Sequence, residues 1–136
     1  MSRSLRVLVA EDNAAYRRGL RELLESADEF EVVGEAENGE EAVRMALVLT
    51  PDVVVMDLRM PDAGGVPRNQ SGLEAIREIT TRHPHVAVVV LSSNDDEGLR
   101  SRARLVGARH YLLKDSDKPR VLAAIRDSAG GSRRRA

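Results

Sequence analysis

Short hydrophobic runs recur along the chain, and each is followed by polar or charged residues. Between the runs, apolar residues are spaced three and four positions apart, which is the pattern of an amphipathic helix with one buried face. The runs themselves lack polar alternation, as is typical of parallel strands covered on both faces. We expect strands at residues 5–10, 30–36, 52–56, 86–91 and 109–113. Five strand-then-helix units predict an α/β sandwich, in which a parallel sheet lies between two layers of helices.

The expected helices have buried faces that are almost entirely aliphatic. Three boundaries carry signals of their own: the third helix ends before His83-Pro84, Gly107 closes the fourth, and Pro119 opens the last. The inward positions are Tyr16, Leu20, Leu23, Leu24 and Ala27; Ala42, Val43, Ala46 and Leu47; Leu73, Ile76 and Ile79; Leu99, Ala103 and Val106; and Val121, Leu122 and Ile125.

Two stretches fall outside this pattern. Residues 62–71, rich in Gly, Pro, Asn and Ser, predict a mobile surface loop. Residues 129–136, dominated by Gly and Arg, predict a linker or a disordered tail. We therefore expect one domain over residues 1–128, which is an ordinary length for a single core.

Composition excludes several classes of protein. The hydrophobic fraction is 42%, and no apolar run is long enough to span a membrane. There is no cysteine for a disulfide or a thiolate metal site, and the first residues do not resemble a secretory signal, so we expect a cytoplasmic protein. A net charge of −1 and only three Phe and Tyr residues do not favour nucleic-acid binding by this domain.

The candidate chemistry lies where the strands end. Glu11 and Asp12 follow the first run, and Asp57 follows the third. Ser92 follows the fourth and Lys114 the fifth, so all five should meet at one edge of a parallel sheet. Carboxylate oxygens are suited to Mg²⁺, and a lysine and a hydroxyl are suited to phosphate. In such a site Asp57 could act as a nucleophile that forms an acyl phosphate.

Simpler interpretations exist for each residue alone. Asp12 could cap the first helix, Ser92 could begin a turn, and Lys114 could be a surface charge. Taken together, five such residues at the ends of different strands favour a shared site.

The same residues, with Met60-Pro61 after Asp57 and Tyr111-Leu112-Leu113 before Lys114, resemble the receiver domain of two-component response regulators, most closely the NarL/FixJ class. The resemblance runs in order over residues 5–128. It implies a (βα)5 doubly wound, five-stranded parallel sheet, a CheY-like or flavodoxin-like sandwich. It also implies that residues 1–128 form a receiver (response regulatory) domain.

The resemblance implies a phosphorylation site with a metal beside it. Asp57 would accept a phosphoryl group from a sensor histidine kinase. Mg²⁺ would be held by Asp12, by Asp57 and by the backbone carbonyl of Arg59, with Glu11 acting through a metal-bound water. The protein would be a phosphorylated signalling switch rather than a turnover enzyme, with slow autodephosphorylation.

The resemblance also implies how the signal would leave the site. Ser92 would be the switch hydroxyl, Lys114 would bind the phosphoryl group, and Tyr111 would be an aromatic that turns inward on phosphorylation. The face formed by residues 95–128 would then form a homodimer or contact an output domain. Relatives usually continue into a helix-turn-helix domain of the LuxR type, which is absent from this chain, so DNA contact and transcriptional regulation are expected only through that missing part.

Two features differ from the family pattern, and two further residues are expected to affect dephosphorylation. Ser92 replaces the more common threonine, and the loop over residues 62–71 is longer than usual. That loop could shield the acyl phosphate, contact the kinase or only decorate the surface, and the last is slightly favoured. Arg59 and Asn94, two positions beyond Asp57 and Ser92, should tune dephosphorylation because an attacking water must pass them.

Rival functions remain open at this point. A Mg²⁺-dependent phosphatase with an aspartyl nucleophile would usually carry a second acid where this chain has Arg59. A flavin- or nucleotide-binding module would need a glycine-rich loop after the first strand, where Glu11-Asp12-Asn13 stands instead. A pseudo-receiver that binds partners without phosphorylation is disfavoured by the intact acids and lysine.

Overall fold

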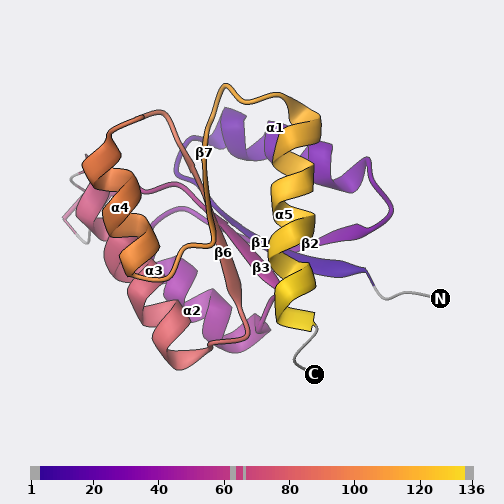
Figure 1. Cartoon of the computed structure of the whole chain (residues 1–136), viewed down its shortest axis with the longest axis horizontal. Coiled ribbons are helices and arrows are strands. Elements are labelled where there is room, and N and C mark those ends of the chain that lie inside the picture. The colour runs from indigo at the N-terminus through magenta and orange to yellow at the C-terminus, as the bar shows by residue number, and fades with distance from the viewer. Residues whose placement is uncertain (1–3, 62–63, 66, 134–136) are drawn as a thin grey trace.

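The central sheet of the computed structural model, which describes residues 4–61, 64–65 and 67–133, has five strands that all run parallel (Figure 1). The strand order is β2-β1-β3-β6-β7. The strands are β1 (Leu5–Ala10), β2 (Phe30–Ala36), β3 (Val53–Met56), β6 (Ala87–Ser92) and β7 (His110–Leu113). This order confirms the expected doubly wound sheet and places β3, which leads to Asp57, at its centre.

Helices cover both faces of the sheet (Figure 1). One layer contains α1 (Ala14–Glu25) and α5 (Lys118–Arg133). The other contains α2 (Gly39–Leu49), α3 (Asn69–Arg82) and α4 (Glu97–Leu105). The five expected strand–helix units are therefore confirmed. Among the described residues, no helix is both long enough and apolar enough to cross a membrane.

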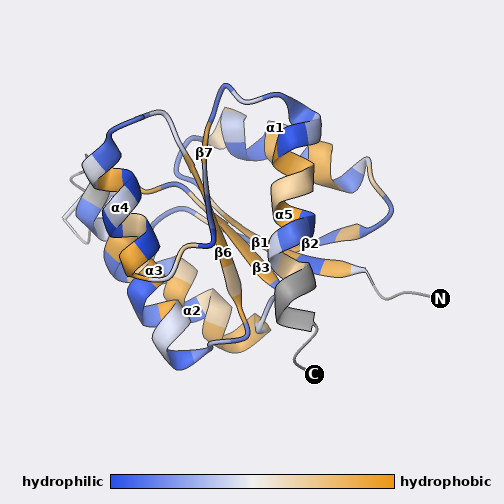
Figure 2. Cartoon of the chain, viewed as in Figure 1, coloured by the Kyte–Doolittle hydropathy of each residue, from blue (hydrophilic) through white to orange (hydrophobic). Residues whose placement is uncertain are grey.

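The core is aliphatic and is divided by the sheet into two clusters. Every residue of β3 is buried, with Val54 and Met56 packing towards α2, α3 and α4, and Val53 and Val55 towards α1 and α5. Figure 2 shows hydrophobic strands at the centre, surrounded by helices that alternate between hydrophilic and hydrophobic residues. Burying a valine or methionine side chain contributes about 1.5–3 kcal/mol, so the strand that carries Asp57 is firmly anchored.

Asparagine and aspartate side chains cap the N-termini of three of the helices. The Asn13 side chain accepts a hydrogen bond from the backbone N–H of Tyr16 at 2.9 Å at the start of α1, and Asn38 and Asp96 act in the same way for α2 and α4. The interpretation of Asp12 as the cap of the first helix is therefore wrong, because its neighbour takes that role.

The expected loop at residues 62–71 is partly replaced by regular structure from residue 67 onward, whereas its mobility stays a prediction. β4 (Met60–Pro61) and β5 (Pro67–Arg68) pair antiparallel as a small hairpin, and α3 begins at Asn69. Met60, in the first arm of the hairpin, is fully buried in the core, which fixes the position of that arm. Residues 62–63 and 66 lie outside the described part of the chain.

Helix α3 begins very close to the segment that follows Asp57. The backbone N–H of Gly72 donates to the carbonyl of Leu58 at 3.0 Å. A Cβ atom at position 72 would lie 2.5 Å from that same carbonyl oxygen, so only glycine allows this approach. Leu58, the residue after Asp57, is itself fully buried, so its position is fixed both by the core and by the contact with α3.

Helix α5 continues beyond residue 128, where we expected a tail to begin. The helix extends to Arg133. Its continuation past residue 128 agrees with the full burial of Ala129, which extends the apolar row formed by Val121 and Ile125. Residues 129–133 are therefore helical, and residues 134–136 lie outside the described part.

The close approach at Gly72 gives a testable consequence for stability. We expect Gly72→Ala to lower the free energy of unfolding by about 1–3 kcal/mol, because the added methyl group must push α3 away from Leu58. Urea denaturation measures this. Gly19→Ala is the matched control: it adds a methyl group in open space on α1 and should be neutral or slightly stabilising. Equal stability of Gly72→Ala and the wild type would contradict the close contact.

Candidate functional site

Three carboxylates meet at the carboxyl ends of β1 and β3. The strands are paired so that Ala10 lies opposite Met56, which places the next residues, Glu11 and Asp57, level with each other. The backbone N–H of Asp57 donates to the carbonyl of Ala10 at 3.0 Å. One carboxylate oxygen from each of Glu11, Asp12 and Asp57 lies within 4.8 Å of the others. The acidic cluster expected from the sequence is therefore assembled by strand register.

The cluster concentrates negative charge in a largely buried place. Glu11 is 2% exposed and Asp57 is 7% exposed, whereas Asp12 lies at the surface. Burial raises the pKa of Asp57 despite the nearby lysine. Desolvation, followed by the hydrogen bond and charge of the Glu11 carboxylate, raises the pKa of Asp12. A cation would relieve both effects, and three carboxylates fit the oxygen ligands that Mg²⁺ prefers.

Lys114 brings the end of β7 into this cluster. Its Nζ lies 2.5 Å from Oε1 of Glu11 and 3.1 Å from Oδ2 of Asp57. Burial alone would lower the pKa of Lys114, but the two carboxylates outweigh that effect and hold the pKa above its usual value. The ammonium group is therefore a permanent positive charge beside Asp57 at neutral pH.

Both oxygens of the Asp57 carboxylate have a partner. Oδ2 accepts from the ammonium of Lys114, and Oδ1 accepts from the backbone N–H of Arg59 at 3.2 Å. The side chain of Arg59 is exposed. The turn after β3 therefore orients the carboxylate with backbone, while the arginine side chain lies at the rim of the site.

Ser92 is buried at the end of β6, the strand next to β3. Val90 lies opposite Met56, so Ser92 stands one position beyond the level of Asp57. Its Oγ accepts from the backbone N–H of Asn94 at 3.1 Å. Ser92 therefore does begin a turn, as the simpler interpretation held, at the same edge of the sheet as the acids.

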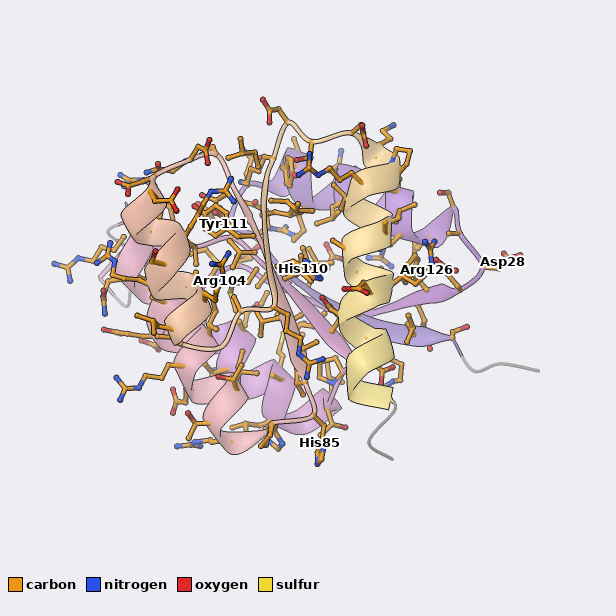
Figure 3. All side chains as sticks on the ribbon, in the orientation of Figure 1. Asp28, His85, Arg104, His110, Tyr111 and Arg126 are labelled. Atoms are coloured by element: carbon orange, nitrogen blue, oxygen red, sulfur yellow. The ribbon has the colours of Figure 1, made fainter. Side chains whose placement is uncertain are left out.

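Tyr111 lies inward in this structure, and its movement on phosphorylation stays a prediction. The residue is 9% exposed, and its hydroxyl donates to the backbone carbonyl of Asn94 at 2.6 Å. The guanidinium of Arg100 in α4 lies 4.7 Å from the ring centre. Figure 3 shows Tyr111 on the α4 side of β7, whereas His110 faces α5. The inward state is favoured because the hydroxyl has a hydrogen-bond acceptor in the Asn94 carbonyl and the ring has a cation over it.

Two residues of α1 reach the site although the sequence analysis gave them no role there. Nη1 of Arg17 donates to the carbonyl of Glu11 at 2.8 Å, and its Nε donates to Glu35 on β2 at 3.1 Å. The Tyr16 ring centre lies 4.5 Å from Nζ of Lys114. Tyr16 fits the helical spacing of a core residue, and nothing in the sequence separates the two roles.

Comparisons with known proteins agree with this geometry. A family model described as "Response regulator receiver domain" matches residues 7–126. The transcriptional regulatory protein DegU of Brevibacillus brevis is 36% identical over 127 residues, which cover 93% of this chain and 51% of that protein. The response regulator GacA of Pseudomonas viridiflava is 36% identical over 129 residues, which cover 95% of this chain and 57% of that protein. The chain thus spans about half the length of these relatives.

Solved structures show the same fold. The receiver domain of the putative response regulator NarL from Mycobacterium tuberculosis superposes with a TM-score of 0.87 at 28% identity, covering 96% of this chain and 99% of that one. A LuxR-family response regulator from Aurantimonas sp. SI85-9A1 gives a TM-score of 0.85 at 29% identity, covering 95% and 87%. By fold, site and sequence, this chain belongs to the family of response regulator receiver domains.

Proposed function

We propose that this chain is a two-component signalling switch in which Asp57 accepts a phosphoryl group from a sensor histidine kinase in a Mg²⁺-dependent step. The observation that carries the proposal is the Asp57 carboxylate, held level with Glu11 and bonded at 3.1 Å to the ammonium of Lys114. Of the two relatives at 36% identity, one is named as a response regulator and the other as a transcriptional regulatory protein, and a receiver of this kind would work in the cytoplasm.

The chemistry would proceed by attack of an Asp57 oxygen on phosphorus. The new P–O bond gives an acyl phosphate, and the bond from phosphorus to the donor breaks with its electron pair leaving on the donor. Lys114 would neutralise negative charge on the transferring group from its place beside Asp57. The Arg59 backbone N–H, already bonded to the other carboxylate oxygen, would keep the nucleophile oriented.

The metal would be held by Asp12, Asp57 and the backbone carbonyl of Arg59, with Glu11 acting through a water. Three carboxylate oxygens within 4.8 Å support this donor set. When bound, Mg²⁺ supplies positive charge that offsets the repulsion between the carboxylates and the phosphoryl oxygens. Glu11 would then share its charge between the metal site and Lys114, which it now contacts at 2.5 Å.

A continuous set of contacts links the site to the output face. Ser92 accepts from the backbone N–H of Asn94, whose carbonyl accepts from Tyr111, whose ring lies under Arg100 of α4. Phosphorylation adds close to two negative charges beside Ser92. We propose that the turn at Asn94 moves as Ser92 is drawn to the phosphoryl group, and that Tyr111 and α4 follow.

The output would be read on the face formed by α4, β7 and α5. That face could form a homodimer or contact an output domain. The relative named as a transcriptional regulatory protein is about twice as long as this chain, so DNA binding is proposed only for a helix-turn-helix domain outside it.

Asp57→Asn tests the phosphoryl acceptor. Incubated with Mg²⁺ and acetyl phosphate, the wild type should gain one phosphoryl group in its intact mass, and Asp57→Asn should gain none because the amide is not a nucleophile of that kind. Removing Mg²⁺ with EDTA should abolish the adduct.

Asp28→Asn makes the same chemical change in the exposed turn between α1 and β2, away from the site, and should behave as the wild type (Figure 3). An adduct on Asp57→Asn would refute the assignment of Asp57. If the wild type gains no adduct and also fails to bind beryllofluoride, the switch is not driven by phosphorylation.

Asp57→Asn should also be at least as stable as the wild type at neutral pH. Folding raises the pKa of Asp57, so its ionised form is less stable in the folded than in the unfolded chain. That penalty is fully present above the folded-state pKa and disappears as the pH falls towards the ordinary aspartate pKa. Thermal unfolding against pH measures it: the advantage of the variant should shrink on acidification. A variant that is less stable at pH 7 would contradict the prediction.

Arg59 and Asn94 should set the lifetime of the acyl phosphate. Both side chains are exposed beside the site. The contacts of Asn94 with Ser92 and Tyr111 use its backbone, and its side chain makes one exposed hydrogen bond, accepted from the backbone N–H of Asp96 at 3.0 Å. Arg59→Ala and Asn94→Ala should therefore keep the fold while opening a path for water, so that the phosphoryl group is lost several-fold faster. Intact mass follows the loss of the phosphoryl group after the phosphodonor is removed. Arg18→Ala, at an exposed position on α1, is the control. Lifetimes unchanged in both variants would exclude this role.

A further inference from the structure

We propose that Tyr16 is a positioning residue that holds the ammonium group of Lys114 beside Asp57. The proposal rests on the proposed function, because it assigns Tyr16 a part in the same phosphoryl transfer. Its starting observation is the ring of Tyr16, whose centre lies 4.5 Å from Nζ of Lys114. That distance is within the range of a cation–π interaction.

A lysine needs several contacts to hold its charge in one place. Its ammonium is a compact group on a flexible four-carbon stem, without the fixed fork of arginine. In this chain Nζ is fixed from three elements: Glu11 after β1 at 2.5 Å, Asp57 after β3 at 3.1 Å, and the ring of Tyr16 on α1. The side chain of Lys114 is 20% exposed, so water is partly excluded and each contact is strengthened.

The ring differs from the two carboxylates in one respect that matters for function. In the proposed reaction Asp57 becomes phosphorylated and Glu11 takes part in the metal site, so both acids change partners. The ring of Tyr16 has no such second role. It can therefore keep the ammonium near the strand ends while the charges around it change.

The space around Lys114 indicates where its side chain could turn if the ring were absent. A cavity of about 590 Å³ lies between α1 and the beginning of α5, and both Tyr16 and Lys114 line it, with Leu23 and Val121 among the other lining residues. A smaller side chain at position 16 would open space into which the stem of Lys114 could turn, away from Asp57. Tyr16 therefore both attracts the ammonium and occupies the alternative position.

The ring, rather than the hydroxyl, carries this role. The Tyr16 hydroxyl lies 3.5 Å from the carbonyl of Lys114, which is too long for a strong hydrogen bond. The backbone N–H of Tyr16 is fixed by the Asn13 cap at 2.9 Å, which places the ring at the first turn of α1. Phenylalanine should therefore replace Tyr16 well, and leucine should not.

The first test observes Lys114 directly, with neither metal nor phosphodonor present. Lys114 and Lys118 are the only lysines in the chain, so two sets of lysine ε-methylene signals suffice for assignment by ¹H–¹³C NMR. Protons over an aromatic face resonate upfield. We expect the Lys114 signal upfield of Lys118 in the wild type and in Tyr16→Phe, and close to it in Tyr16→Leu.

The second test measures the rate at which acetyl phosphate modifies Asp57 with Mg²⁺ present. Tyr16→Leu should lower the maximal rate by about three- to tenfold, and Tyr16→Phe should stay within about twofold of the wild type. Leu23→Ala, in the same cavity and about 10 Å further along α1, controls for a general loss of packing and should leave the rate unchanged.

The outcomes separate this inference from the proposed function. A Lys114 signal that does not move in Tyr16→Leu, a rate equal to that of the wild type, or a Tyr16→Phe variant as slow as Tyr16→Leu would each overturn the role of the ring. If the wild type is not phosphorylated at all, the proposed function fails, while the NMR comparison still decides whether Tyr16 holds Lys114.

Discussion

The parallel pairing of β1 with β3 is the constraint on which the rest of the site depends. Because Ala10 lies opposite Met56, the two strands end at the same level, and the next residue of each is an acid. The strand ends can be held there because β3 is buried on both faces by aliphatic side chains. A slip of one residue in this register would move Asp57 away from Glu11 and from Lys114 together, so the backbone of the sheet decides whether the site exists.

The same constraint creates an electrostatic imbalance. Three carboxylates lie together, and Lys114 is the one cation that contacts two of them among the described residues. Burial raises the pKa of Asp57 because its charge is only partly compensated. A metal ion brings positive charge to the carboxylates, and a phosphoryl group brings negative charge. The electrostatic energy of the site is therefore most favourable when both are bound. Stability at the strand ends is thus lower than the aliphatic core alone would permit, as is common where a protein binds charge.

Much of this could be predicted from the sequence, because the strands and their terminal acids are local patterns. The aliphatic runs gave the five strands, and the acids at their ends gave the cluster. What could not be predicted depends on tertiary contact. The first arm of the hairpin is fixed by the burial of Met60 in the core, and Tyr111 in its inward position contacts Arg100, eleven residues earlier. Tyr16 has the spacing of a core residue, so its contact with Lys114 required the structure.

At Asn94, the backbone and the side chain have different functions. Its backbone N–H meets Ser92 and its backbone carbonyl meets Tyr111, while its exposed side chain accepts a hydrogen bond from the backbone N–H of Asp96 at 3.0 Å within the turn. Any residue that keeps the turn would preserve both backbone contacts. Position 94 can therefore vary during evolution to change how long a signal persists, without changing how it is transmitted. In this fold, the duration of a response and its route through the molecule are open to independent selection.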